Sequence, residues 1–131
     1  MKAIIKKIGG KTYYLTYTGE ALFTITEKYE TIEKVMELVT PETREAFKIL
    51  CDVISILATQ GELARRYYGY DPGEILEAET LEKTMLQPYD IFDLKGAIPR
   101  TVTLGYTTEI EPDADDEIDL SLIELNQKKT V

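Results

Sequence analysis

The side chains that could bind a metal ion lie in one acidic run near the C-terminal end of the chain. Carboxylates fall at positions 1, 3, 5, 7 and 12 of a possible calcium loop, namely Asp113, Asp115, Glu117, Asp119 and Glu124. Position 6 is Ile118, where the sharp turn of such a loop needs glycine, and Pro112 argues against the usual incoming helix. We therefore interpret the run as a solvated acidic linker and expect neither a metal ion nor another cofactor.

A second segment alternates cations with aromatic rings, namely Arg65, Arg66, Tyr67, Tyr68 and Tyr70. Such a pattern can stack single-stranded nucleic acid, but arginine and tyrosine are also enriched at the energetic centres of protein–protein interfaces. An acidic chain suits a protein partner better, so we treat these five residues as candidates for partner binding. A structural interpretation stays open, because arginines favour the last turn of a helix, Gly69 can end that helix, and tyrosine rings can pack inward.

Residues for catalysis are scarce. The chain has no histidine, so the commonest general base and the commonest metal ligand are both missing. Neither the glycine pattern of a phosphate-binding loop nor that of a dinucleotide site occurs. Cys51 lies in an apolar run and is expected to be a buried thiol, and Ser55 is expected to bond a backbone carbonyl. We predict that the protein is not an enzyme.

Length and charge limit the possible partners. The 131 residues are enough for one core, and the composition of 44% hydrophobic and 30% charged residues is that of a folded protein. Residues 1–108 carry 13 basic and 16 acidic side chains, whereas residues 109–131 carry 2 and 8, within a net charge of -9. This charge opposes nucleic-acid binding. Without a long apolar run or a signal peptide, we expect no membrane contact and a location in the host cytoplasm.

The first half of the chain predicts a hairpin followed by helices. Residues 2–8 and 11–17 are β-like, and Gly9-Gly10 between them is a turn signal. Thr18 is expected to cap a helix that runs to about Tyr29, and Thr31 to cap a shorter one. A central helix is predicted to start at Thr40-Pro41, because apolar residues from Phe47 to Leu57 form two stripes.

The second half predicts two more helices. Gly61 is interpreted as a break in the central helix, and the capping pattern at 71–74 predicts a helix from 72 to about 86. A last helix is expected from Pro88 towards Gly105, with a kink or an early stop at Pro99. The alternation after residue 100 also permits a strand. The predicted fold is mainly α (α+β), a helical bundle-like body (1–108) with an N-terminal β-hairpin and an acidic C-terminal tail (109–131).

The tail is expected to act as a tether. Its seven acids between Glu109 and Asp119, with no base among them, favour an extended and solvated segment. Beyond this run an apolar set could order on a partner, either a client or a neighbouring copy, namely Ile118, Leu120, Leu122, Ile123 and Leu125. The alternative is an inert solubilising tail.

Taken in order, these elements resemble a known family. The segments GGKTYYL, YTGEALFTITEKY and TIEKVMEL resemble the opening of the tail assembly chaperones of long-tailed (siphovirus-type) phages and prophages. Later segments, PYDIFDLKGAI, LGYTTEI and EIDLSLIELNQKK, resemble the last helix and the acidic ending of that family. Pro99 departs from the family pattern by interrupting its last helix, and Glu30 does so by replacing a glycine between the first two helices.

The resemblance implies a role in virion morphogenesis without catalysis. Members of the family are thought to bind the tape measure protein, keep it soluble and recruit tail tube protein around it, and a homo-oligomer is possible. The alternative function is an acidic phage inhibitor that mimics nucleic acid and blocks a host protein. Charge distribution separates the two, because a mimic needs carboxylates spread over its folded surface rather than gathered at one end.

Overall fold

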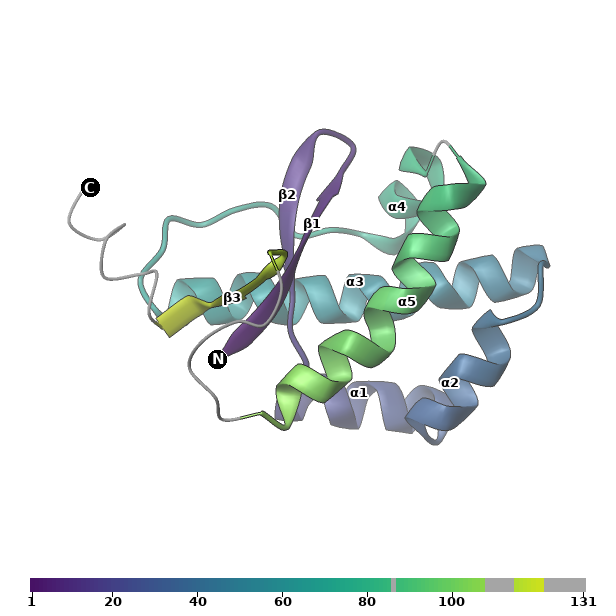
Figure 1. The fold of residues 1–131 in the computed structure, drawn as a ribbon, viewed down its shortest axis with the longest axis horizontal. Helices are drawn as coiled ribbons and strands as arrows, with labels where there is room; N and C mark the ends of the chain where they lie inside the picture. Colours follow the sequence, from purple (N-terminus) through teal and green to yellow (C-terminus); the bar gives the residue numbers. More distant parts are fainter. Residues whose placement is uncertain (86, 108–114, 122–131) are drawn as a thin grey trace.

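The computed structural model describes residues 1–85, 87–107 and 115–121. The elements run β1 (Lys2–Ile8), β2 (Lys11–Leu15), α1 (Gly19–Tyr29), α2 (Ile32–Val39), α3 (Arg44–Tyr67), α4 (Ala78–Thr84), α5 (Pro88–Gly105) and β3 (Glu117–Asp119). The described chain is mainly helical with a small antiparallel sheet, which confirms the predicted fold class (Figure 1).

The N-terminal hairpin forms where the sequence predicts it. β1 and β2 pair antiparallel, with Ile4 opposite Leu15 and Ile8 opposite Lys11. Gly9 and Gly10 have φ angles of 59° and 79°, a left-handed conformation that glycine adopts without steric cost. Alternate residues of β1 and β2, including Ile4 and Leu15, point into the core.

The first two helices are also confirmed. The hydroxyl of Thr18 accepts the N–H of Ala21 at the start of α1, and the hydroxyl of Thr31 accepts the N–H of Lys34 at the start of α2. Between the helices, Glu30 has a φ of 75°, in the region that favours glycine. The strained backbone at Glu30 is therefore the local consequence of having a side chain at that turn.

The predicted start of α3 at Thr40-Pro41 is wrong, because the helix begins at Arg44. Thr40 ends α2 instead, with its hydroxyl donating to the carbonyl of Met36 at 2.5 Å. Thr43 is the N-cap of α3, since its hydroxyl accepts the N–H of Ala46 at 3.1 Å. Both threonines suit a cap, and the position of the turn between α2 and α3 decided between them.

The predicted break at Gly61 is also wrong, because α3 continues through it to Tyr67. A Cβ atom at Gly61 would lie 1.6 Å from the carbonyl oxygen of Tyr14, so the glycine lets β2 cross directly over the helix. Gly69, with a φ of 93°, follows the end of α3 as predicted.

The helix predicted from residue 72 begins later, at Ala78. Two long-range contacts hold the preceding segment outside a helix. The N–H of Gly73 donates to the Glu62 carboxylate at 2.6 Å, and the Ser55 hydroxyl donates to the carbonyl of Leu76 at 2.7 Å. Leu76 itself is buried, so residues 71–77 lie against α3 as an extended connection.

α5 begins at Pro88 as predicted and runs past Pro99 to Gly105. The expected early stop is therefore wrong, and so is the alternative of a strand in residues 100–105. Pro99 is exposed, whereas its neighbour Ile98 is fully buried against the core.

α3 is the centre of the core, as predicted. Figure 1 shows it running behind the hairpin and α5, with the other helices around it. Its fully buried side chains include Leu50, Cys51, Val53, Ile54 and Leu57. The Cys51 thiol has a pKa raised to about 12 by burial, so it stays protonated at neutral pH.

Part of the predicted tail belongs to the folded body. β3 pairs antiparallel with the free edge of β1, with Ala3 opposite Ile118, and gives the strand order β2-β1-β3. The prediction of a solvated tether is therefore wrong for residues 117–119, and the expected boundary at residue 108 excludes a strand of the sheet. Residues 108–114 and 122–131 lie outside the described residues.

Candidate protein-docking groove

The arginine–tyrosine segment predicted to bind a partner lies mainly in contacts within the chain. The guanidinium of Arg65 lies between two rings, with its central carbon 5.1 Å from the centroid of Tyr14 and 5.1 Å from that of Tyr70. These rings come from β2 and from the connection after α3. Arg65 therefore joins two segments that are distant in sequence.

Glu62 completes this arrangement, which we call the clamp (Tyr14, Glu62, Arg65, Arg66 and Tyr70). Glu62 is 6% exposed, and its carboxylate accepts hydrogen bonds from Arg65 at 2.6 Å, Arg66 at 2.8 Å and the N–H of Gly73 at 2.6 Å. Burial acts to raise the pKa of Glu62, but these hydrogen bonds favour the charged form and lower the pKa below its usual range.

The clamp also holds residues 115–121, which we call the strap. The Tyr70 hydroxyl donates to the carbonyl of Leu120 at 3.0 Å, and Leu120 is fully buried in a small cluster with Ala3 and Ala64. The apolar set predicted to bind a partner thus includes one side chain, Leu120, that is already covered by its own chain.

Ion pairs fasten both ends of the strap. The guanidinium of Arg100 on α5 forms two hydrogen bonds with Asp116, at 2.6 and 2.9 Å, and lowers the pKa of that carboxyl. The Met1 ammonium lies 3.0 Å from Asp119. Burial acts to raise the pKa of Asp119, but hydrogen bonds from Ser121 and Met1 outweigh it, so this pKa is also lowered.

The ten residues predicted to bind a partner therefore divide. Arg65, Tyr70 and Leu120 make contacts inside the molecule, and the structural interpretation left open for the arginine–tyrosine segment fits these contacts. Tyr67 is 85% exposed and packs edge-on against the half-buried Tyr68. Arg66 is exposed but bonds Glu62 and the carbonyl of Gly73, and Ile118 packs against the cluster around Leu120. Leu122, Ile123 and Leu125 lie outside the described residues.

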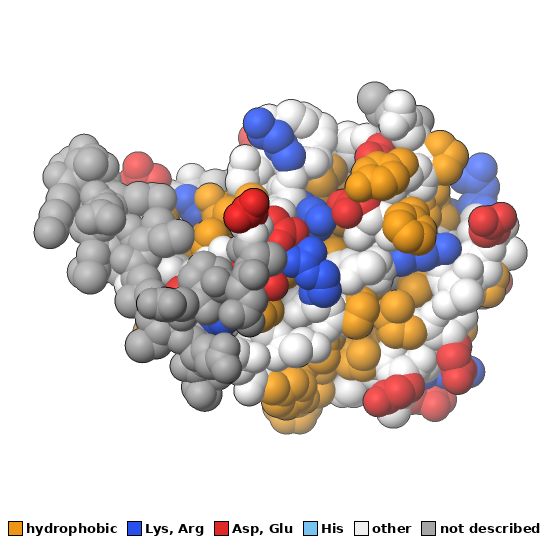
Figure 2. Space-filling model, viewed as in Figure 1, with side chains coloured by type: hydrophobic (Ala, Val, Ile, Leu, Met, Phe, Trp, Pro, Cys, Tyr) orange, Lys and Arg blue, Asp and Glu red, His pale blue; other side chains and the backbone are white. Residues whose placement is uncertain are grey.

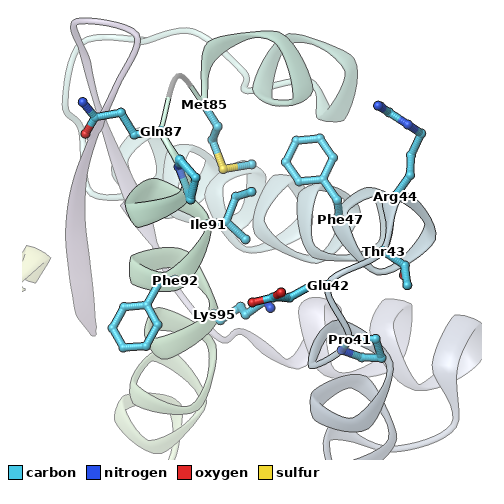
Figure 3. Close-up of a pocket in the computed structure, with 11 residues that line it drawn as sticks. Pro41, Glu42, Thr43, Arg44, Phe47, Met85, Gln87, Ile91, Phe92 and Lys95 are labelled. Atoms are coloured by element: carbon cyan, nitrogen blue, oxygen red, sulfur yellow. The ribbon is translucent and has the colours of Figure 1, made fainter.

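A different feature leaves apolar surface open, a groove of about 590 Å³ between α3 and α5. Four segments line it: the turn between α2 and α3, the first turns of α3, the connection before α5, and α5 itself. The lining residues are Pro41, Glu42, Thr43, Arg44, Phe47, Met85, Gln87, Pro88, Ile91, Phe92 and Lys95 (Figure 3).

The floor of the groove is apolar. Figure 3 shows Phe47 from α3 and Ile91 from α5 on opposite sides of the opening, with Met85 between them. Phe92 lies at the wall and is 74% exposed, and Tyr89, one turn earlier on the same helix, is 66% exposed. Figure 2 shows exposed hydrophobic side chains gathered on the face where α4 and α5 lie. Large exposed rings beside an apolar hollow are typical of a protein-binding surface.

Sequence reasoning missed this groove. Its two walls lie some forty residues apart in the sequence, and the local sequence of each wall has the pattern of an ordinary amphipathic helix. The one local signal was the pair Ile91-Phe92, because adjacent positions on a helix point in different directions and both are covered only where the helix has neighbours on two sides.

The described residues include no cluster of three or more histidine, cysteine, aspartate or glutamate side chains placed to hold a metal ion. No described helix has both the length and the apolar character that crossing a membrane requires. Comparisons with protein-family models, curated proteins and solved structures found no match for this chain.

Proposed function

We propose that this protein is a phage tail assembly chaperone, which binds the tape measure protein and helps to recruit tail tube subunits in the host cytoplasm, without catalysis. The resemblance of the segments at 9–38, 88–110 and 117–129 to that family supports the proposal. The single structural observation that carries it is the apolar groove between α3 and α5 with Phe92 exposed at its wall.

The groove suits a client that is long and helical. Such a client exposes an apolar face that must be covered before tube subunits assemble around it, and a helix laid into an apolar groove is a recurrent way of covering it. The binding is reversible because it uses side-chain packing alone. Incoming tube subunits that cover the same face of the client displace the chaperone, so release requires no nucleotide.

The alternative of a nucleic-acid mimic gains no support from the strap. A mimic must present free carboxylates in place of phosphates. Asp116 is held by Arg100, and Asp119 is held by Met1 and Ser121, so both acids are engaged within the chain.

Co-expression with the tape measure protein of the same phage tests the proposal. The wild-type chain is expected to keep a tagged tape measure protein in the soluble fraction and to copurify with it. Phe92→Asp places a charge at the groove wall and is expected to reduce the copurified amount by about ten-fold. Phe23→Asp is the matched control, because Phe23 is 62% exposed on α1, away from the groove.

Three outcomes would overturn the proposal or its site. Failure of the wild-type chain to copurify with a soluble tape measure protein would exclude the function. Equal binding by the Phe92→Asp variant would exclude the groove as its location, and capture of a host nuclease in place of the tape measure protein would favour the mimic.

A further inference from the structure

We propose that the groove selects a client helix whose apolar residues are flanked by carboxylates, although the chain itself carries a net charge of -9. This inference rests on the proposed function, because it specifies the chemistry of the segment that the groove binds. It starts from the charges at the rim rather than from the apolar floor, which accepts any amphipathic helix.

The rim carries two cations on opposite walls. Arg44 lies on the α3 side and Lys95 on the α5 side, and both line the groove, with the Arg44 side chain extending past Phe47 and away from Ile91 in Figure 3. Neither lies within 4.0 Å of a carboxylate oxygen among the described residues. Within residues 1–85, 87–107 and 115–121, the Lys95 ammonium donates only to the backbone carbonyl of Thr40, at 3.3 Å. Both cations are therefore able to pair with a partner's carboxylate.

This situation contrasts with that of many other cations in the chain. Seven of them pair with carboxylates within the described residues, namely Lys6, Lys11, Lys28, Lys34, Arg65, Arg66 and Arg100. In an acidic protein, cations left without a carboxylate partner beside an apolar groove produce a local field opposite in sign to that of the whole molecule.

The backbone adds to the same field. α3 begins at Arg44 and α5 begins at Pro88, and both of these first residues line the groove. The N-terminal end of a helix carries roughly half a positive charge, which the acids in these first turns, Glu45 and Asp90, partly offset. The opposing charge in the lining is Glu42, so the side chains that line the groove sum to one positive charge, with two cations against one carboxylate.

A helix with acidic flanks therefore complements both the apolar floor of the groove and the cations at its rim. Its apolar side chains contact Phe47, Met85 and Ile91, while carboxylates on its two flanks reach Arg44 and Lys95. A helix with basic flanks offers the same apolar face but places cations against cations and against two helix N-termini, which is unfavourable.

Two synthetic peptides of about 16 residues, long enough to present four helical turns, test this selectivity. Both carry leucine at positions i, i+3, i+4 and i+7, and the flanking positions are glutamate in one and lysine in the other. Binding of the fluorescein-labelled peptides to the full chain is followed by fluorescence anisotropy at about 0.05 M salt, where charge effects are weakly screened. We expect the glutamate peptide to bind about ten-fold more tightly, a difference of about 1.4 kcal/mol.

Charge reversal at the rim locates the effect. The double variant Arg44→Glu, Lys95→Glu is expected to reverse the preference, so that the lysine peptide binds more tightly. The control Lys7→Glu, Lys83→Glu changes the net charge by the same amount at exposed positions outside the groove and is expected to keep the preference for glutamate. Melting curves of both double variants establish that they are folded.

The inference is overturned if the lysine peptide binds as tightly as the glutamate peptide, if neither peptide binds, or if the rim reversal leaves the preference unchanged. Different results overturn this inference and the proposed function. Selective peptide binding without capture of the tape measure protein would contradict that function alone, whereas capture without selectivity would contradict only the acidic flanks.

Discussion

The clamp and the groove use the same kinds of side chain with opposite results. In the clamp, Arg65 lies between two tyrosine rings and pairs with Glu62, so cation, ring and carboxylate satisfy one another. Arg44 and Phe92 line the groove, and both side chains are exposed. Residue type alone therefore does not identify an interface in this protein. What matters is whether other residues of the same chain already contact these side chains.

The clamp is covered and the groove is open because different segments cross the two ends of α3. At the C-terminal end of α3, β2 passes directly over Gly61 and the connection after Tyr70 folds back against Glu62, so the surface is covered. Towards the N-terminal end of α3, α5 crosses it at an angle, and the hollow that Figure 3 shows lies between the two helices. The predictions below test whether the clamp and strap serve stability while the groove serves binding.

The largest effect is expected at the strap. Leu120→Asp places a charge at a fully buried position and should cost several kcal/mol, with the melting temperature lowered by about 10 °C or more. Leu63→Asp on α3 is the control, since Leu63 is 45% exposed, and its effect should stay within about 0.5 kcal/mol. Equal melting temperatures for the two variants would mean that the strap is not part of the folded body.

A somewhat smaller loss is expected in the clamp. Glu62→Ala leaves Arg65, Arg66 and the N–H of Gly73 without their acceptor, which should destabilise the fold by about 3 kcal/mol in urea unfolding. Glu79→Ala, at an exposed carboxylate near the start of α4, should change the unfolding midpoint little. A loss at Glu79 as large as that at Glu62 would contradict a structural role for the clamp.

Acid should loosen the strap before the helical core. The pKa values of Asp116, Asp119 and Glu62 are lowered in the folded protein. The stability they contribute is present above their unfolded values of about 4 and is lost as the pH falls through the folded values. Below about pH 4, hydrogen exchange should therefore quicken at the Ile5 and Leu120 amides, which donate to Asp116 and Met1 carbonyls, before it quickens in α3. Simultaneous loss of protection in both regions would contradict this order.

The smallest effect on stability is expected in the groove. Because Phe92 is 74% exposed, Phe92→Asp should shift the free energy of unfolding by no more than about 0.5 kcal/mol while it weakens client binding. Denaturant unfolding of the same preparation used for the binding test measures this directly. A loss of several kcal/mol would show that Phe92 belongs to the core, and the contrast between groove and clamp would fail.

What the sequence predicted correctly depends on neighbours close in the chain. The hairpin follows from Gly9-Gly10 between two β-like runs, and the starts of α1, α2 and α5 follow from Thr18, Thr31 and Pro88. A cap or a tight turn is satisfied within a few residues, so its energetics are present in the local sequence. The central position of α3 was predictable for a similar reason, because its two apolar stripes require cover on two sides.

What the tertiary structure decided depends on groups far apart in the chain. The local sequence predicts a helix break at Gly61, but this glycine lies under the carbonyl of Tyr14 within α3. Glu62 looks like a surface acid in the sequence, but its carboxylate holds Gly73 outside a helix. Leu120 was predicted to bind a partner, but it is buried in a cluster with Ala3 and Tyr70 of its own chain. Local pattern cannot anticipate these outcomes, because a buried polar group or a close backbone approach is stabilised only after distant segments have met. The groove arose in the same way, from two helix faces that no neighbouring part of the described chain covers.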